Sequence, residues 1–229
     1  MIKECYVKNN RGVPSVDVRY EGIPRGAHSK FKKKRGIVVK RNPSQVNGIV
    51  LHQTAINYVA TEEMLEESQW DEQLALARRV KRVACHALSF DGFFVKTYPL
   101  AWYVSHANYL NKTTLGLEVE GRYEGILGDP STLWKGKPTK FTKGRLEAAC
   151  AALSYLVEEG RNQGMPIRYI YAHRQAKSNR RSDPGEELWR KVALEHGFLK
   201  LGLESRMFYS MGDGRPIPTE WDKRAIAPY

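Results

Sequence analysis

The hydrophobic and polar positions of the chain alternate in ways that predict several strands. GIVLHQT (residues 48–54) is a short apolar and β-branched run, and it predicts a buried strand that ends in polar residues. LGLEVEG (residues 115–121) alternates apolar and acidic residues with a period of two, which is typical of a half-buried strand. IRYIYAH (residues 167–173) is a third strand signal, rich in aromatic and β-branched residues. Asp91-Gly92 separates two further β-prone runs and predicts a hairpin.

Helical patterns occupy the stretches between these strands. Residues 61–83 are good helix formers, and Thr61 followed by two glutamates is an N-terminal signal. Residues 141–163 follow an Ala/Leu-rich helical pattern, and Gly164 marks the expected end. GEELWRKVALEH (residues 185–196) predicts another helix. Because strands and helices alternate, the pattern predicts an α/β domain with a mostly buried sheet.

The two ends of the chain differ in composition from this central part. Residues 1–45 are rich in glycine, proline and basic residues, and we expect a basic N-terminal arm that packs on the domain and is ordered only in part. We expect the folded domain to span residues 46–200. Residues 201–229 are rich in glycine and proline, and we expect a C-terminal extension packed on the domain surface.

The composition limits the class of protein. The 229 residues are 41% hydrophobic, which is enough for one substantial core. No apolar run approaches the roughly 18 residues of a membrane span. The N-terminus lacks the apolar stretch of a secretory signal, so we expect synthesis in the cytoplasm, with release by lysis or delivery by another system if the substrate lies outside. The 3 cysteines are too few for a disulfide scaffold.

The charge favours an anionic partner. The net charge is +12, and eight basic residues lie between Arg25 and Arg41. Such a run is either a solvated segment or a contact for a polyanion, including anionic cell-surface polymers. No helix-turn-helix, zinc finger or aromatic RNA-reading strand accompanies it, so we do not expect specific nucleic-acid binding.

Candidate chemistry appears at the ends of two predicted strands. His52 ends the first strand, His173 ends the third, and Asp183 follows ten residues later in SDPGE. Two imidazoles and one carboxylate are a recurrent catalytic zinc set, which leaves one position for water. A histidine at a strand end is more often a hydrogen-bonded structural residue. The spacing alone therefore does not separate these residues from His86, His106 or the nearby carboxylates.

Several motifs appear together in the order of a known family. IVLHQTA, CHALSFDGFFVKTYPLAWYVSHANYLN, LGLEVEG and AHRQAKSNRRSDPGEELW resemble the type 2 N-acetylmuramoyl-L-alanine amidases, a family that includes phage lysozyme-like amidases and the peptidoglycan recognition proteins. The resemblance covers residues 48–189. It implies a single α/β domain with a central mixed β-sheet flanked by helices. It also implies zinc-dependent hydrolysis of the amide bond between N-acetylmuramic acid and L-alanine in peptidoglycan.

The resemblance assigns roles to individual residues. It makes His52, His173 and Asp183 the zinc ligands, and it places Glu118 of LGLEVEG beside the reacting water as the catalytic base. Glu120 shares the face of Glu118 by the period of two, so the pattern alone does not exclude Glu120 as the base.

Further roles depend on the same resemblance. Arg181 stands where many members carry a lysine that polarises the scissile carbonyl. Arginine keeps the charge and can bind an oxyanion, but it does not donate a proton to the leaving group. The expected substrate-binding residues are His106 and Asn108 in SHAN together with His86 and Trp102, although His86 resembles a largely structural family histidine and burial in the core is the alternative for Trp102.

Rival functions remain to be separated. A catalytically silent peptidoglycan-binding module has the same fold, but the presence of all three expected ligands weighs against it. A basic nucleic-acid-binding protein accounts for the charge but not for the ordered histidine and aspartate motifs. A phosphoesterase that uses the same metal is a more distant alternative, because a second carboxylate-rich metal set is not evident.

Overall fold

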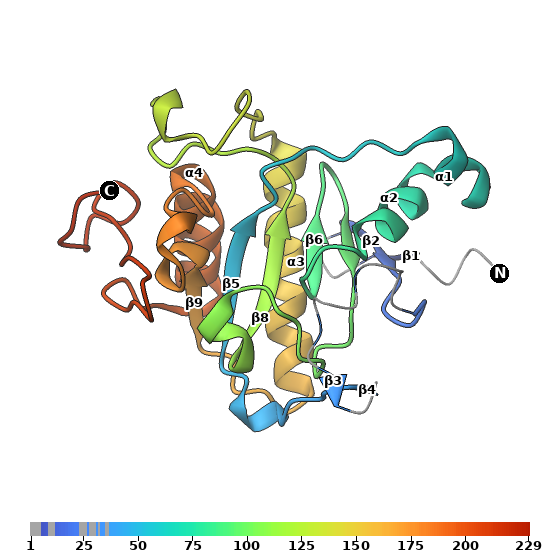
Figure 1. Cartoon of the computed structure of the whole chain (residues 1–229), viewed down its shortest axis with the longest axis horizontal. Coiled ribbons are helices and arrows are strands. Elements are labelled where there is room, and N and C mark those ends of the chain that lie inside the picture. The colour runs from blue at the N-terminus through green and yellow to red at the C-terminus, as the bar shows by residue number, and fades with distance from the viewer. Residues whose placement is uncertain (1–5, 9–11, 23–26, 28–30, 32, 35–36) are drawn as a thin grey trace.

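The structure is a computed structural model of the chain that describes all residues except 1–5, 9–11, 23–26, 28–30, 32 and 35–36. A central sheet runs through the molecule, and the long helix α3 (Lys143–Asn162) lies against one of its faces (Figure 1). In the described part of the chain this sheet has eight strands in the order β1-β2-β7-β6-β8-β5-β9-β10. The predicted α/β domain with a central mixed sheet flanked by helices is confirmed.

Three parallel strands form the middle of the sheet. β5 (Gly48–Gln53) pairs with β8 (Thr114–Val119) on one side and with β9 (Tyr169–Ala172) on the other. All three match the predicted runs, and their side chains are almost all buried because both faces of the sheet are covered. The other strands of the sheet are β1 (Tyr6–Lys8), β2 (Pro14–Asp17), β6 (Ala87–Ser89), β7 (Phe94–Lys96) and β10 (Glu204–Ser205); β3 (Lys33–Lys34) and β4 (Ile37–Val38) form a separate pair.

The predicted hairpin is formed by β6 and β7, which pair antiparallel and make the sheet mixed. Gly92 in its turn has φ 83°, a left-handed conformation that glycine adopts without steric cost. Since β6 also pairs parallel with β8, the hairpin joins the central strands to β2.

The helical pattern of residues 61–83 forms two helices instead of one. α1 (Glu62–Glu67) and α2 (Glu72–Val80) are separated by a turn in which two residues have φ of 53° and 61°. The Asp71 side chain then caps α2 by accepting a backbone N–H from its first turn at 3.0 Å. The Asp71 cap therefore starts a second helix inside the stretch for which the helical pattern alone predicts one continuous helix.

The helix at residues 185–196 extends further than predicted. α4 (Glu186–Leu188), the π-helical stretch η8 (Trp189–Phe198) and α5 (Leu199–Leu201) follow one another without a break, and η8 packs on α3. Short helical turns complete the described elements: η3 (Pro43–Gln45), η4 (Asn108–Lys112), η5 (Pro130–Thr132), η6 (His173–Gln175) and η7 (Ser178–Arg180).

The alternation of the central strands separates two faces of the sheet. On β5, Ile49 and Leu51 enter the large apolar cluster that contains α3, whereas Val50 packs in a different cluster. On β8, Leu117 belongs to the α3 side and Glu118 lines a cavity on the other side. The period of two therefore directs His52 of β5 and Glu118 of β8 to the face opposite α3.

The N-terminal stretch contributes more than the expected arm. β2 pairs with β7 inside the central sheet. Within the basic run, Lys33, Lys34 and Lys40 are exposed, while Arg25, Lys30, Lys32 and Arg35 lie outside the described residues. Arg41 is not a surface charge: it is buried and donates to the backbone carbonyls of Asn111 at 2.9 Å and Leu100 at 2.6 Å.

Residues 201–229 run from the end of α5 through β10 and along the molecule beside the turn that follows β9. None of the described helices has the length and apolar character needed to cross a membrane.

Candidate functional site

Three buried side chains converge at the carboxyl ends of β5 and β9. His52 is in β5, His173 follows β9 directly, and Asp183 comes from the loop after η7. The Nδ1 atoms of His52 and His173 are 3.0 Å apart, and Asp183 Oδ2 lies 3.0 Å from His173 Nδ1 and 3.8 Å from His52 Nδ1. Among the described residues, this is the group of metal-binding side chains whose donor atoms come close enough to hold an ion.

The donor set fits zinc. In a tetrahedral site with bonds of about 2.0 Å, ligand atoms are about 3.3 Å apart, and the three measured distances bracket that value. Burial lowers the pKa of His52 to about 4, so its ring is neutral at pH 7, as ligation requires. Burial opposes ionisation of Asp183, but the hydrogen bond from His173 lowers its pKa below the usual range.

Gln53 fixes the loop that carries Asp183. Its backbone N–H donates to Asp183 Oδ1 at 3.0 Å, and its side-chain amide donates to the carbonyl of Ser182 at 2.6 Å. The same amide joins this loop to Tyr123, whose N–H donates to Gln53 Oε1 at 2.7 Å. Gln53 was not among the site residues predicted from the sequence. The available signal was its position next to His52 at the end of a buried strand.

A relay of ring nitrogens sets the tautomer of His52. His106 Nε2 lies 3.3 Å from the carbonyl oxygen of Thr114, and because a carbonyl only accepts, this nitrogen carries the hydrogen. Burial keeps His106 neutral by lowering its pKa well below the usual range, so its Nδ1 is an acceptor. His52 Nε2, at 3.1 Å from that Nδ1, must then donate. The lone pair of His52 Nδ1 is left facing His173 and Asp183.

The position of His106 depends on a glycine in β8. A Cβ atom on Gly116 would lie 2.9 Å from Cγ of the His106 ring, closer than such atoms approach in proteins. Asn111 holds the backbone of the same segment, since its Oδ1 accepts the N–H groups of His106 at 2.9 Å and Ala107 at 2.6 Å. The glycine of LGLEVEG therefore makes room for the ring behind the candidate metal ligand.

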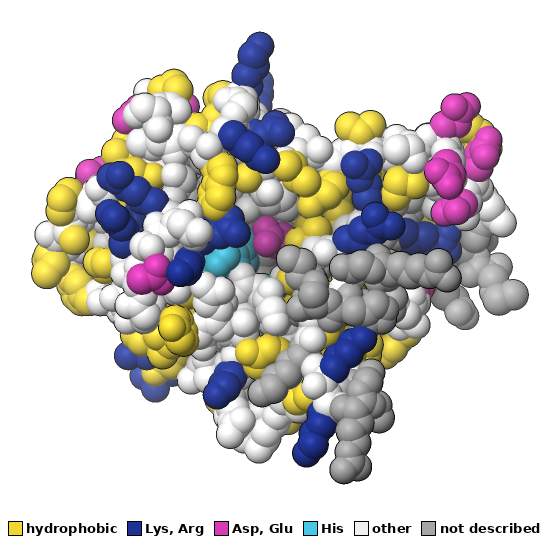
Figure 2. All heavy atoms as spheres, in the orientation of Figure 1, with side chains coloured by type: hydrophobic (Ala, Val, Ile, Leu, Met, Phe, Trp, Pro, Cys, Tyr) yellow, Lys and Arg dark blue, Asp and Glu magenta, His cyan; other side chains and the backbone are white. Residues whose placement is uncertain are grey.

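Two of the three side chains, His173 and Asp183, border a cavity of about 500 Å³. Figure 2 shows a hollow in which histidine and acidic side chains are visible, with lysine and arginine side chains around it. Two of the predicted substrate-binding residues, His106 and Asn108, line this cavity. Its other lining residues include Thr54, Tyr58, Arg82, Ser105, Lys177, Asn179 and Arg180.

Glu118 lines the same cavity, and its Oε2 is buried without a hydrogen-bond partner in the described part of the chain. Burial, and then the negative charge of Asp183, raise the pKa of Glu118 well above its usual range. Glu120 is engaged elsewhere: its carboxylate accepts the N–H of Tyr58 at 2.7 Å and pairs with Arg145 at 3.2 Å. Glu120 follows the last residue of β8, so the strand alternation no longer places it beside Glu118.

The two neighbouring arginines of RRSDPG point to different places. Arg180 lines the cavity, and its guanidinium lies 4.4 Å from the ring centre of Trp134. Arg181, which the sequence analysis assigned to the oxyanion, lies over the ring of Tyr229 at 4.2 Å and lines a neighbouring cavity. Neither Arg180 as a cavity residue nor its contact with Trp134 was predicted, because an irregular turn gives no period from which a side-chain direction follows.

The other two predicted substrate-binding residues do not line the cavity. His86 is fully buried, and its Nδ1 accepts the N–H of Gly116 at 3.0 Å. Trp102 packs in an apolar cluster against Phe31 and Tyr98. Both residues thus have structural contacts in the described part of the chain.

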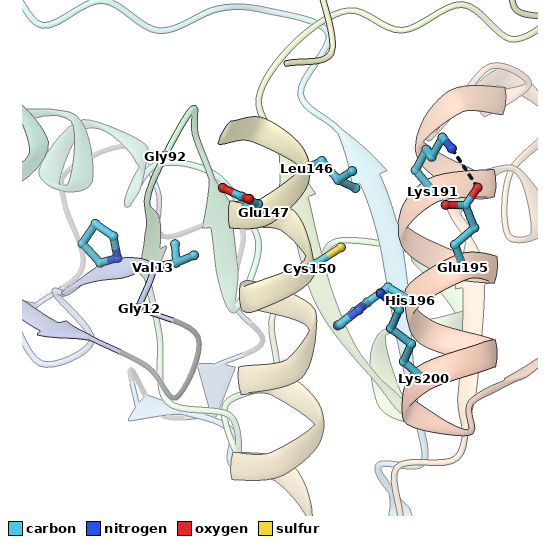
Figure 3. A pocket seen from close by; sticks show the side chains of 11 residues that line it. Gly12, Val13, Gly92, Leu146, Glu147, Cys150, Lys191, Glu195, His196 and Lys200 are labelled. Atoms are coloured by element: carbon cyan, nitrogen blue, oxygen red, sulfur yellow. Dashed lines mark hydrogen bonds and ion pairs between the residues drawn. The ribbon is translucent and has the colours of Figure 1, made fainter. Parts of the chain in front are cut away.

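A second hollow of about 570 Å³ lies on the α3 side of the sheet. Figure 3 shows Cys150 of α3 and His196 of η8 on its wall, with Lys191 paired to Glu195. His196 Nε2 lies 2.9 Å from Ser154 Oγ. In the part of the chain that the structure describes, this hollow does not bring three metal-binding groups together.

The relay predicts the effect of His106→Ala on zinc binding. Without the acceptor for His52 Nε2–H, the affinity for zinc should fall about 10-fold to 100-fold. Competition with a chromophoric chelator measures this change. His196→Ala removes another buried histidine and is the matched control, with unchanged zinc affinity expected. Equal affinities of the His106 variant and the unmodified chain would contradict the relay.

Several solved structures are similar to this chain. The chain is 17% identical to the N-acetylmuramoyl-L-alanine amidase LysC from Clostridium intestinale URNW, with a TM-score of 0.47 over 83% of this chain and 98% of that chain. It is 15% identical to Drosophila PGRP-LB, with a TM-score of 0.46 over 79% of this chain and 94% of that chain. The comparison with curated proteins gives no match.

The family model described as N-acetylmuramoyl-L-alanine amidase matches residues 42–186, more than half of the chain. The match spans β5, β8 and β9 and includes all three converging side chains. It confirms the resemblance seen in the ordered motifs. The chain therefore belongs to the N-acetylmuramoyl-L-alanine amidase family.

Proposed function

We propose that the chain is a zinc-dependent amidase that cleaves the bond between N-acetylmuramic acid and L-alanine in peptidoglycan. The observation that carries this proposal is the convergence of His52, His173 and Asp183 beside Glu118, whose buried Oε2 is free to accept a proton. Membership of the amidase family supports the reaction class. A silent binding module would retain the cavity but would have no use for such a carboxylate.

His52, His173 and Asp183 would hold the metal, with His52 Nδ1 presented by the hydrogen bond to His106. When bound, zinc supplies a Lewis acid for the scissile carbonyl and makes a coordinated water more acidic. Glu118 takes the proton of the attacking water on Oε2 and later passes it to the leaving amine of L-alanine. Its raised pKa suits both steps, because a carboxyl group with the usual pKa would be a weak base at pH 7.

Arg180 is the group that we assign to the developing oxyanion. It lines the cavity, and its charge acts on both Glu118 and His52. The ring of Trp134 limits its side-chain freedom, so less entropy is lost when it binds substrate. Arg82 and Lys177 add positive charge to the same cavity, which suits a peptide substrate with carboxylate groups.

The site of action proposed here is the bacterial cell wall, with peptidoglycan as the partner. The exposed lysines of the basic run, Lys33, Lys34 and Lys40, would add weak contacts to anionic polymers of the cell surface. These contacts would lengthen residence on the wall at low salt and weaken as salt screens them.

Digestion of purified peptidoglycan tests the proposed bond and the metal together. Mass spectrometry of the soluble products should find free stem peptides that begin with L-alanine. Their release should stop after zinc chelation and return when zinc is added, because the three ligands cannot activate water alone. A chain that binds zinc and wall fragments but releases no peptide from any wall type would be a binding module.

Glu118→Gln tests the catalytic base. The amide cannot accept the proton, so turnover should fall by about 10² to 10⁴ while about one zinc per chain stays bound. Peptide release and metal content measured on the same sample give both values. Glu120→Gln is the matched control; it should weaken the fold through Tyr58 and Arg145 but keep turnover. The reverse result would assign the base to Glu120.

Arg180→Ala tests the oxyanion contact. Loss of a preorganised cation at the scissile carbonyl should lower kcat by about 10² to 10³ at saturating zinc. Arg181→Ala, in the adjacent residue, should lower kcat less under the same conditions, because Arg181 does not line the cavity. A larger loss from Arg181→Ala would return the role to the residue that the family pattern indicates.

A further inference from the structure

The segment of residues 206–229 contacts the turn that carries His173. The N–H of Met211 donates to the carbonyl of Gln175 at 2.8 Å, and the N–H of Arg215 donates to the carbonyl of Arg174 at 2.7 Å. The Gln175 side chain donates in turn to the carbonyls of Arg206 and Tyr209, both at 2.8 Å. Four hydrogen bonds thus tie this segment to the two residues that follow His173.

The two backbones touch at Gly214. A Cβ atom at this position would lie 2.1 Å from the carbonyl oxygen of Gln175, and this neighbour is backbone that cannot rotate away. Gly214 has no positive φ, so the glycine serves the close approach and not an unusual conformation. Any side chain there would push the segment away from the turn.

Arg174 connects this contact to Asp183. Its backbone N–H donates to the carbonyl of Asp183 at 3.1 Å, and its guanidinium donates to the carbonyl of Arg181 at 2.9 Å. That guanidinium lies 4.9 Å from the ring centre of Trp221 and 5.1 Å from that of Tyr229. Arg174 is only 2% exposed, and its orientation is set by these two rings together with the carbonyl of Arg181.

Tyr229 also contacts the residues just before Asp183. Its main-chain oxygen accepts from Arg181 at 2.7 Å, and its hydroxyl lies 2.7 Å from Ser182 Oγ. Ser182 Oγ donates to the carbonyl of Thr132 at 2.6 Å, so the Tyr229 hydroxyl donates to Ser182. The hydroxyl end of the Tyr229 ring also lies against Gly125, where an added Cβ atom would clash with the hydroxyl oxygen.

We propose that residues 206–229, chiefly through Tyr229 and Trp221, position His173 and Asp183 for the metal. The segment lies beyond residue 186, where the family match ends, and it adds no residue to the lining of the cavity, although its Asp213 pairs with the lining residue Lys177 at 3.0 Å. This inference rests on the proposed role of His52, His173 and Asp183 as the metal site. His173 and Asp183 are joined by a loop with only two short helical turns, and the segment adds contacts at both ends of that loop to those that Gln53 makes at Asp183.

Tyr229→Ala tests the proposal through the metal and not through activity. We expect zinc affinity to fall about 10-fold or more, the range found when outer contacts of metal ligands are lost. The absorption spectrum of the Co²⁺-substituted protein should change, because it reports ligand geometry. Tyr229→Phe keeps the ring over Arg174 and loses only the hydroxyl, and it should retain most of the affinity. Phe208→Ala, at an exposed position of the same segment, is the matched control.

Gly125→Ala tests the position of the Tyr229 ring without changing Tyr229 itself. In the unmodified background it should displace the Tyr229 ring and weaken zinc binding. In the Tyr229→Ala background it should have no further effect, because the ring it displaces is gone. Should Tyr229→Ala fail to fold, Gly214→Ala provides the same zinc and Co²⁺ measurements through Gln175.

The outcomes separate this proposal from the proposed function. If the unmodified chain binds neither zinc nor Co²⁺, the metal site itself is refuted. If it binds about one equivalent and folded Tyr229→Ala binds equally tightly with the same Co²⁺ spectrum, the positioning role is overturned. A lower melting temperature with unchanged affinity and spectrum overturns it as well, because that result describes a purely structural contact.

Discussion

The site depends on holding three electron-rich atoms within 4 Å of one another in a buried place. If imidazole nitrogens and a carboxylate oxygen all direct lone pairs at one metal ion, they repel one another, so each group needs support on its far side. For His52 this support is the hydrogen bond to His106, which ends on the carbonyl of Thr114. For Asp183 it is the N–H of Gln53. Both supporting groups come from the central strands or the segments beside them.

The sheet separates the requirements of stability and chemistry. The inward residues of β5, β8 and β9 pack with α3 in one large apolar cluster, which can be dense because it contains no functional group. The opposite face carries His52, Glu118 and, at the end of β9, His173. Gly116 of β8 lies on that face. Because glycine has no side chain, the His106 ring can occupy the space beside it. One residue pattern with a period of two thus specifies both the core and the site.

Local patterns in the sequence were sufficient to predict the strands and the helix that position the site. β8 was predicted from its period of two, α3 from its helical pattern, and β5 and β9 from their apolar, β-branched or aromatic runs. The ends of β5 and β9 indicated His52 and His173. The directions of Arg180 and Arg181 were not predictable, since an irregular turn has no period and contacts with Tyr229, distant in sequence, decide where Arg181 lies. The burial of Trp102 depends on Phe31, which is distant in sequence. Contacts of this kind are set by tertiary structure, which a single sequence pattern does not contain.

Metal binding and folding are coupled in such a site. A metal that binds these three groups in the folded chain, where they are already close together, would stabilise the folded chain by mass action. The loop from His173 to Asp183 has little regular structure of its own, and its conformational entropy would otherwise oppose ligation. Contacts from residues 206–229 reduce that entropy before any metal arrives, because Arg174 is already held between Trp221 and Tyr229. A segment outside the family match can therefore raise metal affinity without contributing a ligand.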